Sequence, residues 1–299
     1  MTAAVVGVDI GGTKTAAALV GPGGEVLERR EVSTPARSGP KAVLDAAAGL
    51  AADLLGAAGA GPVGVGTAGT VDPATGSIRY ATDSLPGWTG APVAEALAAR
   101  LGREVRVIND VNAAALGECW AGAGRNRAHV LLAAVGTGLG GAIVRNGRVE
   151  AGARGAAGEV GHLPAPGADR LRCGCGRYGH LEAIASGTGL AAAYAIATGT
   201  RVTGRAVADR AAAGDEVARQ VVDRAGSVLG AALAGLVALL DPAAVLVAGG
   251  AAGALLPAAS AAYAAELPAG WADVPLLPAA LGADAVVVGA ARLALEQTE

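Results

Sequence analysis

The chain opens with short apolar runs that are separated by glycines. Residues 5–8 are mostly valine and lead through Asp9 into a Gly-Gly pair at 11–12, which is typical of a buried strand that enters a tight turn. Residues 15–20 and 25–32 continue this pattern on either side of a Gly-Pro-Gly-Gly turn. The pattern therefore predicts a three-strand meander at the start of the chain.

Longer amphipathic stretches follow the meander. In residues 41–55 the apolar positions recur every three or four residues, which is the spacing of one helix face. Similar patterns predict further helices over 91–101, 111–121, 223–240 and 285–295, and strands over 62–67, 104–108 and 244–248. Strands that alternate with helices indicate an α/β fold.

The glycine-turn meander occurs a second time, in residues 130–149. A shift of 124 positions places the Gly-Thr pair at 12–13 on the Gly-Thr pair at 136–137. Two copies of one meander predict two similar lobes that face each other across a cleft. Asp9 falls on Ala133 in the second copy, so the scaffold does not require this acid twice. We therefore expect Asp9 to serve chemistry.

Composition and charge narrow the possible classes of protein. The 299 residues can form two lobes, and because Phe is absent, Ala and Gly must provide close backbone packing. A net charge of −3 provides no field that would recruit nucleic acid or an anionic membrane. The uncharged run 225–240 is shorter than the ~20 residues that a bilayer requires, so we expect a buried helix. Three cysteines and no visible secretory signal predict a reducing, cytoplasmic location.

The first glycine turn has the composition of an anion-binding site. Gly11 and Gly12 let a ligand approach the backbone closely. Consecutive N–H groups through Thr13 would form a nest, to which Lys14 adds a positive charge. Asp9, at the mouth of the turn, could hold a magnesium ion. An ordinary glycine hairpin would explain the same residues, but the second copy of the turn favours a phosphate site on both.

The second turn also matches a dinucleotide-binding pattern. Gly136, Gly138 and Gly141 satisfy G-x-G-x-x-G after a strand. A dinucleotide site requires a helix after the glycines, so that its N-terminus faces the pyrophosphate. Residues 142–144 instead continue into an Asn-Gly turn at 146–147, which is typical of a hairpin. We therefore reject a Rossmann site.

Thiols and imidazoles gather in the middle of the chain. Cys173 and Cys175 lie between His162 and His180. Two thiolates and two imidazoles suit a tetrahedral structural zinc. A pair of unligated thiols is the alternative, and the residues by themselves leave it open.

Six motifs resemble those of the ROK family (repressors, uncharacterised reading frames and sugar kinases) of the actin-like, hexokinase-like ATPase superfamily. They are GVDIGGTKT at 7–15, IND at 108–110, GTGLGG at 136–141, GEVGH at 158–162, CGCGRYGHLE at 173–182 and LVAGG at 246–250. The resemblance spans nearly the whole chain and implies a two-lobed actin-like/hexokinase-like ATPase fold with a cleft between the lobes. It implies an N-terminal lobe over 1–118, joined by a C-terminal helix over 285–299, and a C-terminal lobe over 119–284.

The resemblance also implies roles for individual residues. Asp110 would be the general base that takes a proton from a sugar hydroxyl, although an N-cap of the following helix would explain the same acid. The residues implied to contact the sugar are Asn109, Asp110, Glu159, His162, Glu182, Ser84 and Gly69. Those implied to bind the nucleotide and its magnesium ion are Asp9, Gly11, Gly12, Thr13, Lys14, Thr137, Gly138, Gly249 and Gly250.

Some positions depart from the family pattern. Ser84 stands where family glucokinases often carry an asparagine that contacts the sugar, and a hydroxyl lacks the amide donor pair. The loop over 66–72 has Ala68 and Thr70 in place of the usual prolines. His180 occupies a cysteine position of the family's zinc site, which has one histidine and three cysteines. The implied zinc ligands are therefore His162, Cys173, Cys175 and His180.

The leading hypothesis is an ATP-dependent hexose kinase, most simply a glucokinase that forms the 6-phosphate with ATP, magnesium and a structural zinc. The alternative is an N-acylmannosamine kinase or another hexose or hexosamine kinase. A non-catalytic sugar sensor is disfavoured because Asp9 and Asp110 are both present. Family repressors add an N-terminal helix-turn-helix, for which we expect no room before the first strand. The resemblance further implies a homo-oligomer, a dimer or tetramer, that binds a small sugar and ATP.

Overall fold

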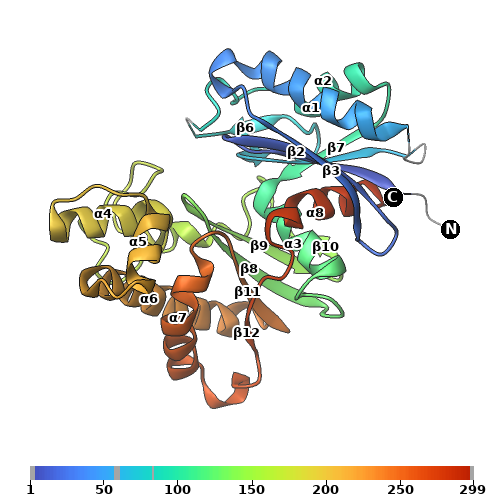
Figure 1. Cartoon of the computed structure of the whole chain (residues 1–299). Helices are drawn as coiled ribbons and strands as arrows, with labels where there is room; N and C mark the ends of the chain where they lie inside the picture. The colour runs from blue at the N-terminus through green and yellow to red at the C-terminus, as the bar shows by residue number, and fades with distance from the viewer. Residues whose placement is uncertain (1–3, 57–60, 83, 297–299) are drawn as a thin grey trace. The chain divides into compact units, whose positions relative to one another are not determined.

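Two five-stranded sheets with the same strand order form the core of the protein (Figure 1). The computed structural model describes residues 4–56, 61–82 and 84–296. The first sheet has the order β3 (Val26–Ser33), β2 (Lys14–Val20), β1 (Val5–Ile10), β4 (Val63–Thr67) and β7 (Val105–Asn109). The second has the order β10 (Arg148–Val149), β9 (Leu139–Arg145), β8 (His129–Val135), β11 (Ala244–Ala248) and β12 (Leu276–Pro278). The matching orders confirm the α/β fold with a repeated meander.

Contacts divide the chain into two compact units. Unit 1 comprises Met1–Asn126, Ile143–Ala157 and Ala280–Glu299, and unit 2 comprises Arg127–Ala142 and Gly158–Ala279. Residues 119–126, 143–157 and 280–284, which the sequence-based boundaries assigned to the C-terminal lobe, thus group with unit 1. Residues 1–3, 57–60, 83 and 297–299 fall within the predicted lobes but lie outside the described part of the chain.

A buried carboxylate explains part of this grouping. Glu118, near the end of α3 (Asp110–Ala121), is fully buried and accepts hydrogen bonds from the backbone N–H groups of Ala280 and Leu281, at 2.9 and 2.7 Å. It also accepts from the N–H of Ala123 at 2.8 Å. Because a buried carboxylate needs such donors, Glu118 fastens the 280–281 segment to unit 1. Glu118 and Ala280 are 162 positions apart, so no local sequence pattern predicts this contact.

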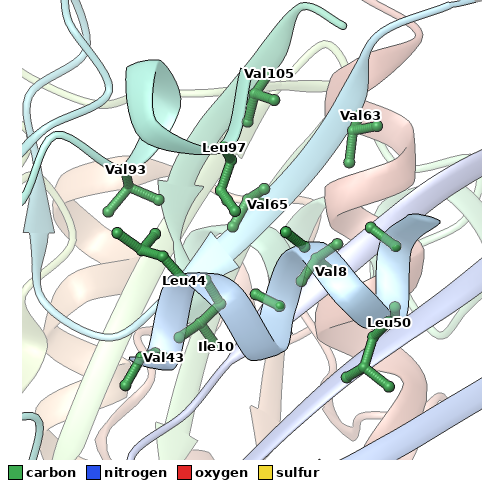
Figure 2. Close-up of a cluster of buried hydrophobic side chains, with 14 of the residues drawn as sticks. Val8, Ile10, Val43, Leu44, Leu50, Val63, Val65, Val93, Leu97 and Val105 are labelled. Atoms are coloured by element: carbon green, nitrogen blue, oxygen red, sulfur yellow. The ribbon is translucent and has the colours of Figure 1, made fainter. Parts of the chain in front are cut away.

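Helices cover both faces of the sheet in unit 1. α1 (Pro40–Leu55) and α2 (Val93–Leu101) pack on one face, where Val8 and Ile10 of β1 point toward Leu44 and its neighbours (Figure 2). Val5, on the opposite side of β1, packs with Val287 of α8 (Ala285–Ala294). This alternation along a strand is expected when both faces are buried. The apolar run at the start of the chain thus fills two cores.

Glycines allow α8 to lie in backbone contact with its neighbours. A methyl group on Gly289 would overlap the carbonyl oxygen of Ala113 in α3, and one on Gly64 of β4 would overlap that of Ala290. Contact at this range is closer than any side chain would permit. Glycine therefore takes the place of the missing large side chains here, as the composition predicts.

We expect Gly289→Ala to lower the free energy of unfolding by about 1–3 kcal/mol, because the overlap with α3 outweighs the better helix propensity of alanine. Gly49→Ala is the matched control, since Gly49 is exposed on α1 and an added methyl group meets nothing within 4 Å. It should raise stability by about 0.5–1 kcal/mol. Urea unfolding measures both, and a Gly289→Ala protein as stable as wild type would contradict the packing described above.

Unit 2 contains α4 (Gly187–Thr198), α5 (Gly204–Ala212), α6 (Glu216–Leu240) and α7 (Ala252–Glu266). The sequence predicted α6 only from residue 223, but it begins at Glu216, where the side chain of Asp215 caps the N–H of Ala218 at 3.0 Å. Among the described residues, α6 is the one helix long and apolar enough to cross a membrane. Its Gly226 and Gly230 lie against the backbone of α7, as in the core helix of a folded domain.

Two short features were not predicted. The segment after β4 is a hairpin of β5 (Thr70–Val71) and β6 (Ile78–Tyr80), whereas the sequence indicated only a loop. β12 pairs in parallel with β11 but is three residues long and contains a proline. Such strands are too short to have a hydrophobic period, so only their pairing partners define them.

Candidate functional site

The first glycine turn has its carbonyl groups tied to the protein. The hydroxyl of Thr34 donates to the carbonyl oxygen of Gly11 at 2.7 Å, and its N–H donates to that of Thr13 at 2.9 Å. The N–H of Gly11 donates to the carbonyl oxygen of Lys14 at 3.0 Å. The N–H groups of Gly12 and Thr13 donate to no acceptor within the described part of the chain. Two adjacent N–H groups are thus available for an anion.

The second turn repeats this arrangement in unit 2. The N–H of Gly187 donates to the carbonyl oxygen of Gly136 at 2.9 Å. The carbonyl oxygen of Thr137 accepts from the N–H of Thr188 at 3.0 Å and from its hydroxyl at 2.8 Å. The N–H groups of Thr137 and Gly138 have no acceptor among the residues that the structure describes. Both copies of the turn therefore have the hydrogen-bonding pattern of a phosphate nest.

Lys14 and the Gly249–Gly250 pair are the remaining residues that the sequence predicted to bind the nucleotide. The ammonium group of Lys14 is exposed and pairs with Glu31 on β3. Gly249 follows β11 with φ of 100° and lies against the carbonyl oxygen of Val135 at the end of β8. A side chain at Gly250 would meet nothing within 4 Å. The backbone at Gly250 therefore borders open space, next to the point where Gly249 meets the end of β8.

Asp9 and Asp110 lie at the carboxyl ends of β1 and β7, which belong to the parallel part of the first sheet. Ile10 of β1 is in register with Thr67 of β4, and Thr67 is in register with Asn109 of β7. Burial, with repulsion from Asp110 as the next cause, raises the pKa of Asp9 to about 7. Burial also raises the pKa of Asp110, against the opposing effect of the N–H of Val111. Two desolvated carboxylates at a strand edge are characteristic of functional sites.

Asn109, and not Asp110, caps α3. Its side-chain oxygen accepts from the N–H groups of Val111 and Asn112 at 2.9 and 3.1 Å. Its amide nitrogen donates to the carbonyl oxygen of Gly69 and to Oδ1 of Asp110, both at 3.0 Å. Asp110 is therefore the first residue of the helix. Both hydrogen bonds to its side chain go to Oδ1, and none of the described residues donates to its Oδ2.

The loop that contains Ser84 lies beside the first glycine turn. A side chain on Gly12 would approach the carbonyl oxygen of Ser84 to 2.8 Å. Trp88 anchors the loop, because its ring is buried and its indole N–H donates to the hydroxyl of Thr67 at 3.1 Å. The structure thus brings Ser84, Gly69, Asn109 and Asp110 together with the turn in unit 1.

The four predicted zinc ligands converge in the segment 162–180, here called the metal loop. The ligand atoms of His162, Cys173, Cys175 and His180 all lie within 4.8 Å of one another. Cys173 Sγ lies 3.7 Å from His162 Nδ1, and Cys175 Sγ lies 3.3 Å from His180 Nδ1. A tetrahedral zinc with ordinary bond lengths requires S···N edges of about 3.5 Å, and these two S···N distances are close to that value.

Protonation of the metal loop opposes metal binding. Burial raises the pKa of the Cys173 thiol to about 12, and a hydrogen bond from this thiol to Glu182 acts in the same direction. Metal binding at this residue would require the thiolate, so it would release the Cys173 proton.

Glu182 has contacts that its predicted sugar-binding role did not anticipate. It lies in a 3-10 turn, Leu181–Ala183, directly after the metal loop. Its Oε1 accepts from the N–H of Gly174 at 3.0 Å, and its Oε2 accepts from the N–H of Leu139 at 3.1 Å. Glu159 and His162, in contrast, lie exposed at the Val160–His162 turn. Glu182 thus contacts both the metal loop and Leu139, directly after the second glycine turn.

Sequence reasoning missed Thr34 and Thr188, the two threonines that hold the turns. Each lies far along the chain from the carbonyl groups that it contacts, with no motif in common. The one local signal is Ser186, whose side chain caps α4 by accepting from the N–H of Gly189 at 3.0 Å. A serine before a helical pattern marks a helix start, but it does not reveal which turn the helix holds.

Comparison with known proteins found a matching family model and several proteins of similar sequence. The family model described as "ROK family" matches residues 5–297. The chain is 39% identical over 296 residues to the bifunctional enzyme NanE/NanK of Brucella melitensis, covering 97% of this chain and 54% of that protein. It is 38% identical to the N-acetylmannosamine kinase of Shigella boydii, over 96% of this chain and 97% of the relative. It is 32% identical to the glucokinase of Thermotoga maritima, over 82% and 81%.

Solved structures match over nearly the full length. The ROK hexokinase of Thermus thermophilus superimposes with a TM-score of 0.86 at 38% identity, covering 97% of each chain. The ROK glucokinase of Streptomyces griseus, solved with glucose and AMPPNP, superimposes with a TM-score of 0.83 at 34% identity, covering 97% of this chain and 99% of that one. The chain spans about half the length of the Brucella NanE/NanK enzymes.

Proposed function

The chain belongs to the ROK family, and we propose that it is an ATP-dependent sugar kinase that transfers the γ-phosphate to the 6-hydroxyl of a hexose. The main support is the hydrogen bonding of the two glycine turns. In each turn the carbonyl groups accept hydrogen bonds from the protein, while two consecutive N–H groups have no acceptor among the described residues. Phosphoryl transfer requires mainly positioning and charge neutralisation, which such turns supply.

The acceptor side of the reaction centres on Asp110. Its desolvated carboxylate would accept the proton of the sugar 6-hydroxyl as that oxygen attacks phosphorus. The amide of Asn109 holds Oδ1 of Asp110, so Oδ2 is the oxygen we assign to the proton. We also propose that the sugar is bound by Asn109, Gly69, Ser84, Glu159, His162 and Glu182.

The donor side comprises both turns. We propose that the N–H groups of Gly12, Thr13, Thr137 and Gly138 bind phosphate oxygens and that Gly249–Gly250 lie against adenosine. Asp9 would hold the magnesium ion, which neutralises phosphate charge when bound. The exposed Lys14 would have to leave Glu31 to reach a phosphate.

Two sugars are candidates for the acceptor. Glucose is the simpler proposal and agrees with the glucokinase and hexokinase relatives. N-acetylmannosamine is favoured by the N-acetylmannosamine kinase of Shigella boydii, which has higher identity and fuller coverage than the glucokinase of Thermotoga maritima. Ser84 is relevant because it lacks the amide that family glucokinases often place there, and the smaller side chain leaves more room.

A structural zinc in the metal loop forms part of the proposal. Two thiolates and two imidazoles at the observed spacing would hold it, and the ion would cross-link residues 162 to 180. The ion would bind one imidazole nitrogen of His162, and this would orient the other nitrogen toward the sugar.

An ADP-release assay over glucose, mannose, N-acetylglucosamine and N-acetylmannosamine tests the proposal. We expect one of glucose and N-acetylmannosamine to exceed the other in kcat/KM by at least about 100-fold, because a site built for one polar substituent rejects its analogue. Phosphorus NMR of the product should place the phosphate on the 6-hydroxyl. If none of the sugars changes the rate of ADP release, the protein is not a kinase for these sugars.

A further inference from the structure

We propose that the side chains of Thr15 and Thr34 form a chain of two hydroxyl groups, here called the hydroxyl chain, that orients the N–H of Gly12 toward a phosphate group of the nucleotide. Thr34 is the positioning residue, and Thr15 orients the hydroxyl of Thr34. The proposal rests on the proposed function in one respect, since it takes the turn at 11–13 as a phosphate site. It adds two residues that act on this site through the backbone.

Thr34 contacts the turn twice, from the position directly after β3. Its hydroxyl donates to the carbonyl oxygen of Gly11 at 2.7 Å, and its N–H donates to the carbonyl oxygen of Thr13 at 2.9 Å. A carbonyl oxygen can only accept, so the single proton of the Thr34 hydroxyl is committed to Gly11. That hydroxyl can therefore take part in a further hydrogen bond only as an acceptor.

This assignment fixes the direction of the next hydrogen bond. The hydroxyl oxygens of Thr15 and Thr34 lie 2.8 Å apart, and either of them could be the donor. Because the proton of Thr34 is already used, Thr15 must donate. The hydroxyl chain therefore runs from Thr15 through Thr34 to the carbonyl oxygen of Gly11. Hydrogen bonds that follow one another in this way polarise and strengthen each other.

The carbonyl group of Gly11 determines where the N–H of Gly12 points. The two groups share one trans peptide plane, so they point in opposite directions. Because Thr34 holds the carbonyl group, the N–H of Gly12 is directed away from Thr34, and it has no acceptor among the residues described. An N–H group that is already oriented binds phosphate with less ordering cost.

The second copy of the meander indicates that the strand itself does not require the hydroxyl of Thr15. The shift of 124 positions places Thr15 on Leu139. Both side chains are buried, with 0% and 2% exposed, so this position of the fold also accepts a side chain without a hydrogen-bonding group. A buried hydroxyl costs free energy unless it is hydrogen-bonded, and that of Thr15 is bonded to Thr34. Its presence in one copy alone favours a role at the first turn.

Calorimetric binding of Mg-AMPPNP tests the hydroxyl chain. We expect Thr34→Val to raise the Kd about tenfold, because valine keeps the shape and the N–H contact but leaves the carbonyl group of Gly11 without its hydroxyl donor. Thr15→Val should raise the Kd about threefold, since the Thr34 hydroxyl loses its own donor, and Thr34→Ser should stay within about twofold of wild type. The double variant Thr15→Val/Thr34→Val should bind no more weakly than Thr34→Val alone, because Thr15 acts only through Thr34.

Steady-state kinetics distinguish this role from a general loss of structure. Thr34→Val should raise the KM of ATP about tenfold and leave the KM of the sugar unchanged. Thr198→Val is the matched control, because the hydroxyl of Thr198 also donates to a backbone carbonyl oxygen, that of Tyr194 at 2.8 Å, but Thr198 is the last residue of α4 and lies outside both glycine turns. This variant should bind Mg-AMPPNP as wild type does.

Several results would overturn the proposal. A wild-type Kd in Thr34→Val would mean that the hydroxyl does not orient the turn, and weak binding by Thr34→Ser would mean that the methyl group is what matters. A double variant that binds more weakly than Thr34→Val would refute the order of the hydroxyl chain. If Thr34→Val does not fold, Thr34→Ala and Thr15→Val decide by the same Kd. A wild type that binds no AMPPNP would refute the proposed function itself, whereas active protein with a wild-type Kd in both valine variants would refute only the hydroxyl chain.

Discussion

Asp110→Asn is expected to lower kcat by at least about a thousandfold while the Kd of Mg-AMPPNP changes by less than about threefold. The amide keeps the size of the side chain and can still accept the N–H of Val111 at the start of α3. It cannot take a proton from the attacking hydroxyl, and a positioned base typically contributes 10²- to 10⁴-fold. Steady-state kinetics and calorimetry measure the two quantities separately.

Asp215→Asn is the matched control for this substitution. Asp215 also begins a helix and accepts a backbone N–H, but it belongs to α6 and contacts Tyr194 at 2.6 Å. Its kcat should stay close to that of wild type. Because burial raises the pKa of Asp110, the acid limb of the kcat/KM profile should lie at higher pH than an ordinary aspartate would give. Near-normal turnover by Asp110→Asn would refute its assignment as the base.

Asp9→Asn is expected to change activity and stability in opposite directions. Loss of a magnesium ligand should lower kcat about a hundredfold or more, because the ion neutralises charge that develops on the phosphate oxygens. The same change should raise the free energy of unfolding of the protein without divalent cations. The reason is that the ionised carboxylate of Asp9 is buried and repelled by Asp110.

The pH dependence of stability follows from the pKa of Asp9, which rises from 3.8 in the unfolded chain to about 7 in the fold. The folded state then binds this proton more tightly, so ionised Asp9 destabilises the fold increasingly from pH 4 to pH 7. Asp9→Asn should match wild type near pH 4 and exceed it above pH 7, by up to about 4 kcal/mol.

Thermal unfolding at several pH values in metal-free buffer measures this difference. Asp215→Asn again provides the contrast, because hydrogen bonds from Tyr194 and from the N–H of Ala218 lower the pKa of Asp215. That variant should lose stability at neutral pH. A wild type that equals Asp9→Asn at pH 8 would mean that Asp9 is not desolvated as described.

The sequence was sufficient for the features that repeat or that depend on local composition. The meander and its glycine turns follow from periodicity and from a shift of the chain against itself, and the strand orders of both sheets confirm them. Asp9 could be selected because its repeat copy has Ala133 instead, and Asp110 because the motif at 108–110 resembles that of the ROK family. Such signals survive in a linear sequence because they are local.

Long-range hydrogen bonds could not be predicted. Thr34, Thr188 and Glu118 each hold backbone groups that lie far along the chain, and single polar residues of this kind resemble ordinary loop or helix residues. Asn109 was expected only on the sugar, whereas it also caps α3, because choosing between adjacent polar residues requires the dihedral angles. The double contact of Glu182 is invisible for the same reason.

The close seating of α8 on β1, β4 and α3 has a consequence for the order of folding during synthesis. These partners are complete when residue 121 has been made, but α8 begins at Ala285, about 160 residues later. At ordinary elongation rates this interval lasts roughly 8 to 32 s. During it, the face of the first sheet around Val5 lacks its native cover. The unit whose strands are translated first is therefore completed only when α8 has been made.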